Sequence, residues 1–358
     1  MECHLITGGA GFIGSNYVLN ARRSGIKIIN LDKLTYAGNL QNLAELERDT
    51  QYKFIHGGIE NAELVAWILN EYKPRAIINF AAESHVDRSI VDPEVFVRTN
   101  VLGTATLLRV INDWWKRLHR EQATRFRFLH ISTDEVYGSL GINGLPFTEK
   151  TPYAPNSPYS ASKAASDHLI QAFHETYGFP ALLTNCSNNY GPRQFPEKLI
   201  PLVILNALEH KALPIYGQGN NIRDWLHVDD HCEAIRLVLD MGQPGEKYNI
   251  GGHAELTNLE IVKKICSILD NISPGQEPHS KLITFVPDRL GHDFRYAINC
   301  SKIEQKLGWK PKHDIESGLV ETVHWYLNNR AWVNNIRTGA YHAWIQQNYS
   351  LANRTNNP

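Results

Sequence analysis

Two acidic residues follow one another directly after an apolar segment near the middle of the chain. Residues 126–131 are predicted to form a buried strand, and Thr133, Asp134 and Glu135 come where that strand should end. In open α/β sheets, ligands bind outside the carboxyl ends of the strands. Adjacent carboxyl groups in a partly dry site can differ in protonation, so that one acts as an acid and the other as a base. A solvated acidic turn is the alternative interpretation.

A tyrosine and a lysine four residues apart form a second candidate pair. Tyr159 and Lys163 should share one face of a helix predicted over residues 159–177. A lysine ammonium near a phenol lowers the phenol pKa, which would let Tyr159 act as a base towards a sugar hydroxyl at neutral pH. Lys163 could also hold a nicotinamide ribose. On its own the spacing favours an ordinary amphipathic helix, so the interpretation depends on the rest of the chain.

A glycine-rich turn near the N-terminus supplies that context. Gly8, Gly11 and Gly14 lie between a predicted first strand and a helix predicted over residues 12–23. Glycines let the backbone approach a pyrophosphate, which then sits at the helix N-terminus. Asp32 ends the next predicted strand, where an acid grips a ribose diol. Because Asp32 would repel a 2′-phosphate, we expect NAD rather than NADP; a simple turn acid is the alternative.

Predicted strands and helices alternate through the first half of the chain. Their order predicts an α/β fold, a Rossmann-type doubly wound parallel sheet with a smaller mixed α/β substrate-binding lobe. We expect residues 1–185 to form an NAD-binding domain, to which the chain returns with segments at about 220–250. Residues 186–330 should mainly form the substrate-binding lobe, and residues 331–358 a tail packed on the body.

The composition restricts the class of protein. A hydrophobic content of 42% and a charged content of 20% indicate a packed globular protein, and 36 basic against 37 acidic residues give no general attraction to nucleic acid or an anionic membrane. The five cysteines are odd in number and widely spaced, so we expect free thiols of a reducing compartment and no metal site. No apolar run approaches the length of a membrane span. We therefore expect a cytoplasmic protein without nucleic-acid or membrane partners.

Taken together, these residues resemble the extended short-chain dehydrogenase/reductase family and, within it, the dTDP-glucose 4,6-dehydratases. The resemblance covers nearly the whole chain. Its narrowest motifs are residues 32–39 (DKLTYAGN), residues 81–89 (AAESHVDRS) and the triplet 133–135, with further similar segments at 188–192, 195–201, 223–225 and 339–341. Epimerases and decarboxylases share the glycine-rich turn and the Tyr/Lys spacing. The acid pair after threonine distinguishes the dehydratases from them.

The resemblance implies a reaction on a nucleotide sugar in which bound NAD is regenerated in every turnover. It implies that Tyr159 takes the C4 hydroxyl proton as hydride leaves C4, while Thr133 hydrogen-bonds the same oxygen. Glu135 then removes the C5 proton as general base, and Asp134 protonates the departing C6 hydroxyl as general acid. Hydride returns to C6 to give a 4-keto-6-deoxy sugar. The sequence alone does not order the acid and the base; that order comes from the resemblance.

The resemblance also implies ligand contacts. Those to the cofactor fall on the glycine-rich turn and the strand ends, namely Gly8, Gly11, Phe12, Ile13, Gly14, Asp32, Lys33, Leu34, Thr35, Gly58, Ile59, Ala81, Ala82, Thr99, Tyr159, Lys163 and Asn189. Those to the substrate fall on Ser84, Thr133, Asn188, Lys198, Leu199, Pro214, Ile215, Tyr216, Arg223, Asn258, Arg289 and His292. Lys198, Arg223 and Arg289 are candidate clamps for a diphosphate, although basic residues are often merely solvated.

Position 58 departs from the family pattern. Family members usually carry an acid there, on the adenine side of NAD, whereas this chain has Gly58. We expect that contact to be lost or replaced, and NAD to be retained somewhat less tightly.

Two other functions stay open on the sequence. An epimerase, or a dehydratase for another nucleotide sugar such as UDP-glucose, would use the same scaffold, although an epimerase needs no acid/base pair at C5 and C6. A non-catalytic NAD-binding regulator would also keep the fold. The presence of Thr133, Asp134, Glu135, Tyr159 and Lys163 together argues against the regulator. Family members are usually homodimers through the helices at about 94–117 and 159–177, so we expect a homodimer.

Overall fold

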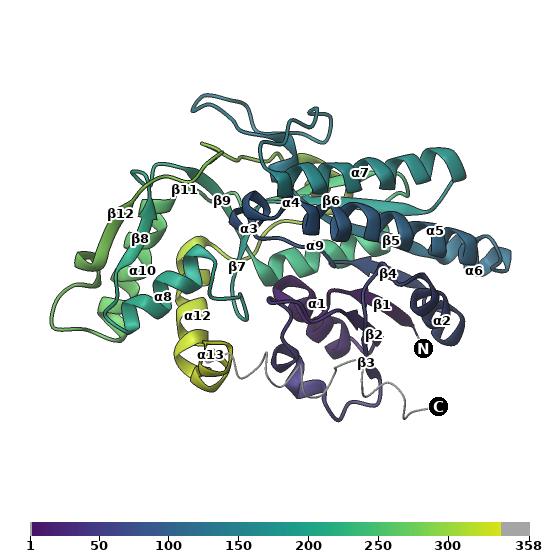
Figure 1. Cartoon of the computed structure of the whole chain (residues 1–358), viewed down its shortest axis with the longest axis horizontal. Helices are drawn as coiled ribbons and strands as arrows, with labels where there is room; N and C mark the ends of the chain where they lie inside the picture. The colour runs from purple at the N-terminus through teal and green to yellow at the C-terminus, as the bar shows by residue number, and fades with distance from the viewer. Residues whose placement is uncertain (1, 338–358) are drawn as a thin grey trace.

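The computed structural model describes residues 2–337, and its centre is a seven-stranded sheet (Figure 1). Every strand pair in this sheet is parallel, and the strand order is β10-β6-β5-β4-β1-β2-β3. The order reverses direction after β1, as in a doubly wound fold, which confirms the predicted fold class. The strands are β1 Cys3–Thr7, β2 Lys27–Asp32, β3 Tyr52–His56, β4 Ala76–Asn79, β5 Arg127–Thr133, β6 Ala181–Cys186 and β10 Lys247–Ile250.

Helices cover both faces of this sheet, so its strands are buried on both sides except at the edge strand β3, which is partly exposed. Consecutive residues of β1 point into different cores: Leu5 packs with the helices α2, α5 and α7, and Ile6 packs with α1 and α9. This burial explains why β1, β2, β4 and β6 read as nearly continuous apolar segments. The helices are α1 Phe12–Arg23, α2 Ala62–Tyr72, α5 Thr104–Trp115, α7 Pro158–Tyr177 and α9 Val228–Met241, with short helices α3 Val86–Val91, α6 Arg120–Arg125 and α11 Ser301–Leu307 nearby.

The helix predicted as one element near residues 94–117 is interrupted. It begins as α4 Pro93–Phe96, widens into the π-helical segment η2 Val97–Gly103, and resumes as α5. The side chain of Asn100, within η2, is buried, with 1% of it exposed. A π-helical segment shifts the helix face by the extra residue in its turn, and such segments are frequent at functional sites.

A second group of elements packs beside the sheet around its own apolar core. The three-stranded sheet has the order β11-β9-β7, and a two-stranded sheet pairs β12 with β8. These elements are β7 Asn188–Tyr190, α8 Leu199–Leu208, β8 Leu213–Tyr216, β9 Ile222–His227, β11 Glu255–Thr257, α10 Asn258–Ile272, β12 Ile283–Val286, α12 Ile315–Asn328 and α13 Arg330–Arg337. Three 3₁₀ segments complete the described chain: η1 Leu40–Leu46, η3 Asp134–Tyr137 and η4 His279–Leu282. That residues 1–185 bind NAD and residues 186–330 mainly bind the substrate stays a prediction.

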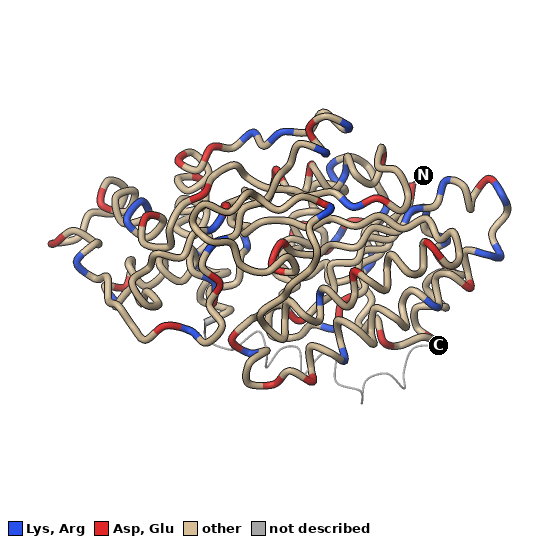
Figure 2. The backbone as a smooth tube through the Cα atoms, turned by 90° about the horizontal axis from the view of Figure 1, so that it is seen from above, with Lys and Arg blue, Asp and Glu red and all other residues tan. Residues whose placement is uncertain are grey.

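The distribution of charge and the length of the apolar helices bear on the expected lack of nucleic-acid and membrane partners. Figure 2 shows basic and acidic residues interspersed along the chain. Within residues 2–337, no helix is long and apolar enough to cross a membrane. Of the predicted C-terminal tail, Trp332 and Val333 are buried against the second core. Residues 338–358, including the motif at 339–341, lie outside the described part.

Candidate active site

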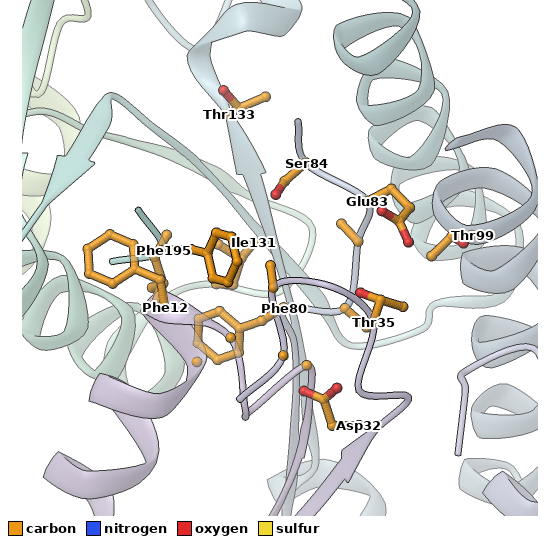
Figure 3. Close-up of a pocket in the computed structure, with 18 of the residues that line it drawn as sticks. Phe12, Asp32, Thr35, Phe80, Glu83, Ser84, Thr99, Ile131, Thr133 and Phe195 are labelled. Atoms are coloured by element: carbon orange, nitrogen blue, oxygen red, sulfur yellow. The ribbon is translucent and has the colours of Figure 1, made fainter. Parts of the chain in front are cut away.

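A cleft of about 320 Å³ opens at the carboxyl ends of the central strands. Figure 3 shows Asp32 towards one end of this cleft and Thr133 towards the other, with Phe12, Phe80 and Ile131 between them. All predicted cofactor residues except Leu34 line it. Of the predicted substrate residues, Ser84, Thr133, Asn188 and Lys198 line it. The cleft is therefore long enough to bring the dinucleotide fingerprint and the Tyr/Lys pair into one site.

The glycine-rich turn is shaped by close backbone contacts. Gly8 has a φ of +72°, and a Cβ at this position would lie 2.7 Å from the backbone nitrogen of Ala81, at the end of β4. A Cβ at Gly14 would collide with the carbonyl oxygen of Gly8. No side chain caps α1 at Gly11, so the helix N-terminus is left to a ligand. This arrangement fits a pyrophosphate, which the positive end of the helix dipole attracts.

Asp32 is held in place by the backbone around it. The backbone amides of Ala10 and Leu34 each donate to one oxygen of its carboxylate at 2.8 Å. Burial raises the pKa of Asp32, and these two hydrogen bonds lower it. Leu34 itself does not line the cleft: it has a φ of 55° and a buried side chain, so it serves the site through its amide. Each carboxylate oxygen keeps a lone pair for a ribose hydroxyl.

The acid pair divides between two environments at the end of β5. The chain turns from β5 into η3, and the backbone amide of Glu135 donates to Thr133 Oγ1 at 3.2 Å. Glu135 lines the cleft, whereas Asp134 is 1% exposed and does not line it. Within the described residues, Asp134 Oδ2 has no hydrogen-bond partner. The two neighbouring carboxyl groups are thus chemically distinct.

Burial and charge separate the proton affinities of the pair. Burial raises the pKa of Asp134 well above its usual range, and the charges of Glu135 and Asp224 raise it further. Burial also raises the pKa of Glu135, but the positive charges of Arg223, Lys198 and Arg289 oppose that rise. Asp134 is therefore the carboxyl group that more readily keeps a proton, and Glu135 is the one that more readily ionises.

Tyr159 and Lys163 both line the cleft, and the lowering of the Tyr159 pKa by Lys163 stays a prediction. Burial raises the pKa of Tyr159 well above its usual range, and the charge of Glu135 adds to the effect. Lys163 Nζ donates to the carbonyl oxygen of Ile131 at 2.8 Å and lies 3.2 Å from His130 Nε2. The ammonium is thus held by β5, and a side-chain hydrogen bond with Thr133 opposes the rise of the phenol pKa.

A buried carboxylate that the sequence analysis missed supports this part of the site. Asp167 Oδ2 accepts hydrogen bonds from Ser132 at 2.9 Å, Tyr153 at 3.0 Å and Asn185 at 3.1 Å. The charge of Asp167 raises the pKa of Lys163, opposing the lowering caused by burial. The signal was available, because Asp167 lies four residues after Lys163 on the same helix face.

Asn100 is a second missed residue. Its side chain accepts from the backbone amide of Glu83 at 2.9 Å, and donates to the Glu83 carbonyl oxygen at 3.0 Å and to Ser162 Oγ at 2.8 Å. It therefore ties the strand-end segment 81–84 to the helix that carries Tyr159 and Lys163.

The remaining predicted substrate residues lie outside the cleft lining: Leu199, Pro214, Ile215, Tyr216, Arg223, Asn258, Arg289 and His292. The side chain of Ile215 is 1% exposed. Tyr216 and Arg289 both approach Asp87, with Tyr216 Oη 3.5 Å from Oδ2 and Arg289 Nη1 3.5 Å from Oδ1. The ring of His292 packs edge-on against Tyr216. These three residues form a cluster on the second group of elements, and their contact with substrate stays a prediction.

Residues 2–337 contain one group with metal-ligating side chains, His227, Asp229 and His313, away from the cleft. The two imidazoles are stacked, with ring centroids 4.0 Å apart and planes 27° apart. Because imidazole lone pairs lie in the ring plane, stacked rings direct them side by side rather than at one ion. This group gives no reason to revise the expectation that the active site holds no metal, which stays a prediction.

Comparison with known proteins adds the family. The family model for GDP-mannose 4,6 dehydratase matches residues 5–322. A dTDP-glucose 4,6-dehydratase of Xanthomonas campestris pv. campestris (strain B100) is 57% identical over 343 residues, which cover 95% of this chain and 97% of the relative. The chain belongs to the dTDP-glucose 4,6-dehydratase family.

Solved structures of this family agree with the fold. The dTDP-glucose 4,6-dehydratase of Bacillus anthracis, solved in complex with NAD, is 47% identical with a TM-score of 0.83, and the match covers 94% of this chain and 100% of that chain. The enzyme of Streptomyces venezuelae, solved with NAD bound, is also 47% identical with a TM-score of 0.83, covering 92% and 98% of the two chains.

Proposed function

We propose that the protein is an NAD-dependent hydro-lyase that converts dTDP-glucose to dTDP-4-keto-6-deoxyglucose and water. The observation that carries this proposal is the unequal acid pair Asp134 and Glu135, one fully buried and one lining the cleft beside Tyr159. The dehydratases named above support it, and so do the two structures solved with NAD. The residues present fit NAD, because the glycine-rich turn, Asp32 and Lys163 line one continuous cleft.

The chain's own groups would share the proton transfers. When bound, NAD supplies a hydride acceptor for C4 and returns the same hydride to C6. Tyr159 would take the proton of the C4 hydroxyl, with Thr133 hydrogen-bonded to the same oxygen. The resulting ketone acidifies the C5 proton, which Glu135 would remove, while Asp134 would protonate the C6 hydroxyl as it leaves as water. A proton delivered to C5 would replace the one that Glu135 removed, and with the hydride returned by bound NAD the reaction would balance.

Three cations would hold the substrate diphosphate. Lys198, Arg223 and Arg289 all lie close enough to Glu135 to lower its pKa. Lys198 lines the cleft, and Arg223 is held by the carbonyl oxygens of Ile222 at 2.8 Å and Asp293 at 3.0 Å. Guanidinium and ammonium groups match phosphate oxygens. The same three cations oppose the rise of the Glu135 pKa that burial causes.

A panel of nucleotide sugars tests the proposed activity. The purified protein with NAD should convert dTDP-glucose to a product lighter by one water, and should convert UDP-, CDP- and GDP-glucose much more slowly, as followed by mass spectrometry. Loss of water from UDP-glucose at an equal or higher rate would contradict the thymidine preference. Inversion at C4 without loss of water would replace the dehydratase by an epimerase.

The proposal extends to assembly and location. Val91, Val97 and Leu102 are 86%, 48% and 59% exposed along one stretch of residues 86–103, and these apolar side chains support a homodimer through this region. All five cysteines are free and buried, which supports a reducing compartment such as the cytoplasm.

A further inference from the structure

The space beside Gly58 is filled by a side chain from another position. A Cβ built on Gly58 would lie 2.5 Å from the Cδ of Glu60, so a side chain at 58 would require the Glu60 carboxyl group to move. The φ of Gly58 is not positive, so the backbone itself does not require glycine here. In this structure the carboxyl group of Glu60 therefore occupies the space that a side chain at 58 would take.

This carboxylate lines the cleft at a defined end. The cleft runs from the glycine-rich turn past Asp32 to Gly57, Gly58, Ile59 and Glu60, which follow β3. In dinucleotide-binding sheets the pyrophosphate lies at the first helix and the acid after the second strand grips the ribose. The end of the neighbouring strand β3 then lies beyond the ribose, where the adenine must be.

One oxygen of Glu60 is engaged and the other is not. Lys33 Nζ lies 2.6 Å from Glu60 Oε1 in an ion pair whose two side chains are about half exposed. In the described part of the chain, no side chain or backbone group donates a hydrogen bond to Oε2, the oxygen nearest Gly58. The neighbouring Ile59 is 2% exposed, so the backbone that carries Glu60 is anchored in the core. An ionised carboxylate only accepts hydrogen bonds.

We propose that Glu60 accepts a hydrogen bond from the 6-amino group of the cofactor's adenine, and so selects an adenine dinucleotide. The inference rests on the proposed use of NAD, and of the two outcomes expected at Gly58, a lost or a replaced acid contact, it favours replacement. It also predicts that this protein retains NAD as tightly as family members that carry an acid at position 58.

Competition between two dinucleotides tests this contact without any sugar nucleotide. The protein is incubated with equal amounts of NAD and nicotinamide hypoxanthine dinucleotide, which has a carbonyl oxygen in place of the amino group. After desalting, the bound nucleotides are released and quantified by mass spectrometry. Wild-type protein should take up NAD in about tenfold excess, as expected for a hydrogen bond to a charged group.

Three variants complete the test. Glu60→Ala should take up the two dinucleotides nearly equally, whereas Glu63→Ala, which removes an exposed acid from the first turn of α2, should keep the preference. Gly58→Asp combined with Glu60→Ala should restore the preference, because an acid from 58 reaches the vacated space. Matching melting temperatures would show that all variants are folded.

The outcomes separate this inference from the proposed activity. An unchanged NAD preference in Glu60→Ala, or no restoration by the double variant, would overturn the Glu60 contact while leaving dehydration of dTDP-glucose untouched. A selective but inactive protein would support Glu60 and contradict the proposed activity. Uptake of neither dinucleotide by the wild type would overturn both.

Discussion

At the scale of single residues, the site depends on how neighbouring groups are solvated. Asp134 and Glu135 are adjacent in sequence, yet only Glu135 faces the cleft and the cations around it. Water is withdrawn from Asp134 without any compensating donor at its Oδ2 among residues 2–337. A protonated acid and an ionised base can therefore coexist one residue apart.

Replacing each carboxyl group should separate their roles. Glu135→Gln should abolish exchange of the substrate C5 proton with solvent, because its amide cannot accept that proton. Asp134→Asn should retain part of this exchange but lose formation of the dehydrated product. Each change should lower the overall rate by about 100-fold or more. Proton magnetic resonance of substrate and product in deuterated water measures both; full exchange by Glu135→Gln would contradict the assignment.

The rate should depend on pH in a direction set by the same groups. Because the pKa of Glu135 is raised, the rate should rise with pH above the range of an ordinary glutamate, and it should fall again only when Asp134 loses its proton. Arg223→Gln removes a charge that lowers the pKa of Glu135, so the acid limb of kcat should move to higher pH. Arg236→Gln, an exposed change on α9, should leave it in place. An unmoved acid limb in Arg223→Gln would contradict the coupling.

At the scale of elements, two devices bring the side chains together. The turn from β5 into η3 presents Glu135 to the cleft, and the π-helical segment η2 turns Asn100 inward to Ser162. Phe96, at the end of α4, packs edge-on against Tyr159 at 6.3 Å between ring centroids. The π-helical segment η2 and the adjoining α4 thus support α7, the helix that carries Tyr159 and Lys163.

Removing Asn100 should weaken the fold and the site together. Asn100→Ala leaves the Glu83 amide and Ser162 without their buried partner, which should cost about 2 kcal/mol and lower the melting temperature by several degrees. The rate should fall as well, because the strand end at 81–84 loses its anchor. Arg98→Ala changes an exposed residue of the same segment and is the control. Equal melting curves for both variants would contradict this account.

The sequence predicted the regular elements better than the irregular ones. The helices α1 and α7 begin and end within a residue of their predicted ranges, because Gly11 and the Ser157 capping box mark their starts and Gly178 ends α7. The π-helical segment escaped prediction because its apolar spacing resembles that of an ordinary helix. The strands β7, β9, β10 and β11 were not predicted, because their pairing depends on partners distant in sequence.

At the scale of the whole molecule, long-range contacts decide the electrostatics. Asp224 and Arg223 on β9 influence Asp134 and Glu135 on the first sheet, although about ninety residues separate them in sequence. The motifs predicted which residues belong to the site, but only the packing of the second group of elements on the sheet decides which carboxyl group keeps its proton. The filling of the Gly58 space by Glu60 is likewise visible only in three dimensions.

The exposed apolar residues of segment 86–103 belong to this scale too. Light scattering at micromolar concentration should give twice the chain mass of 40.6 kDa. Leu102→Glu places a charge in the proposed interface and should shift the protein towards the monomer. Leu145→Glu, at a side chain that is 86% exposed in another loop, should leave the dimer intact. A monomeric wild type would contradict the proposed assembly.

Turnover of dTDP-glucose in deuterated water tests the central claim most directly. The mechanism predicts a product that has lost one water and carries one deuterium at C5, while the hydrogen at C6 comes from C4 of the same sugar and not from solvent. Product analysis by mass spectrometry and magnetic resonance distinguishes these positions. Loss of water without deuterium at C5, or solvent deuterium at C6 in place of the transferred hydride, would contradict the account.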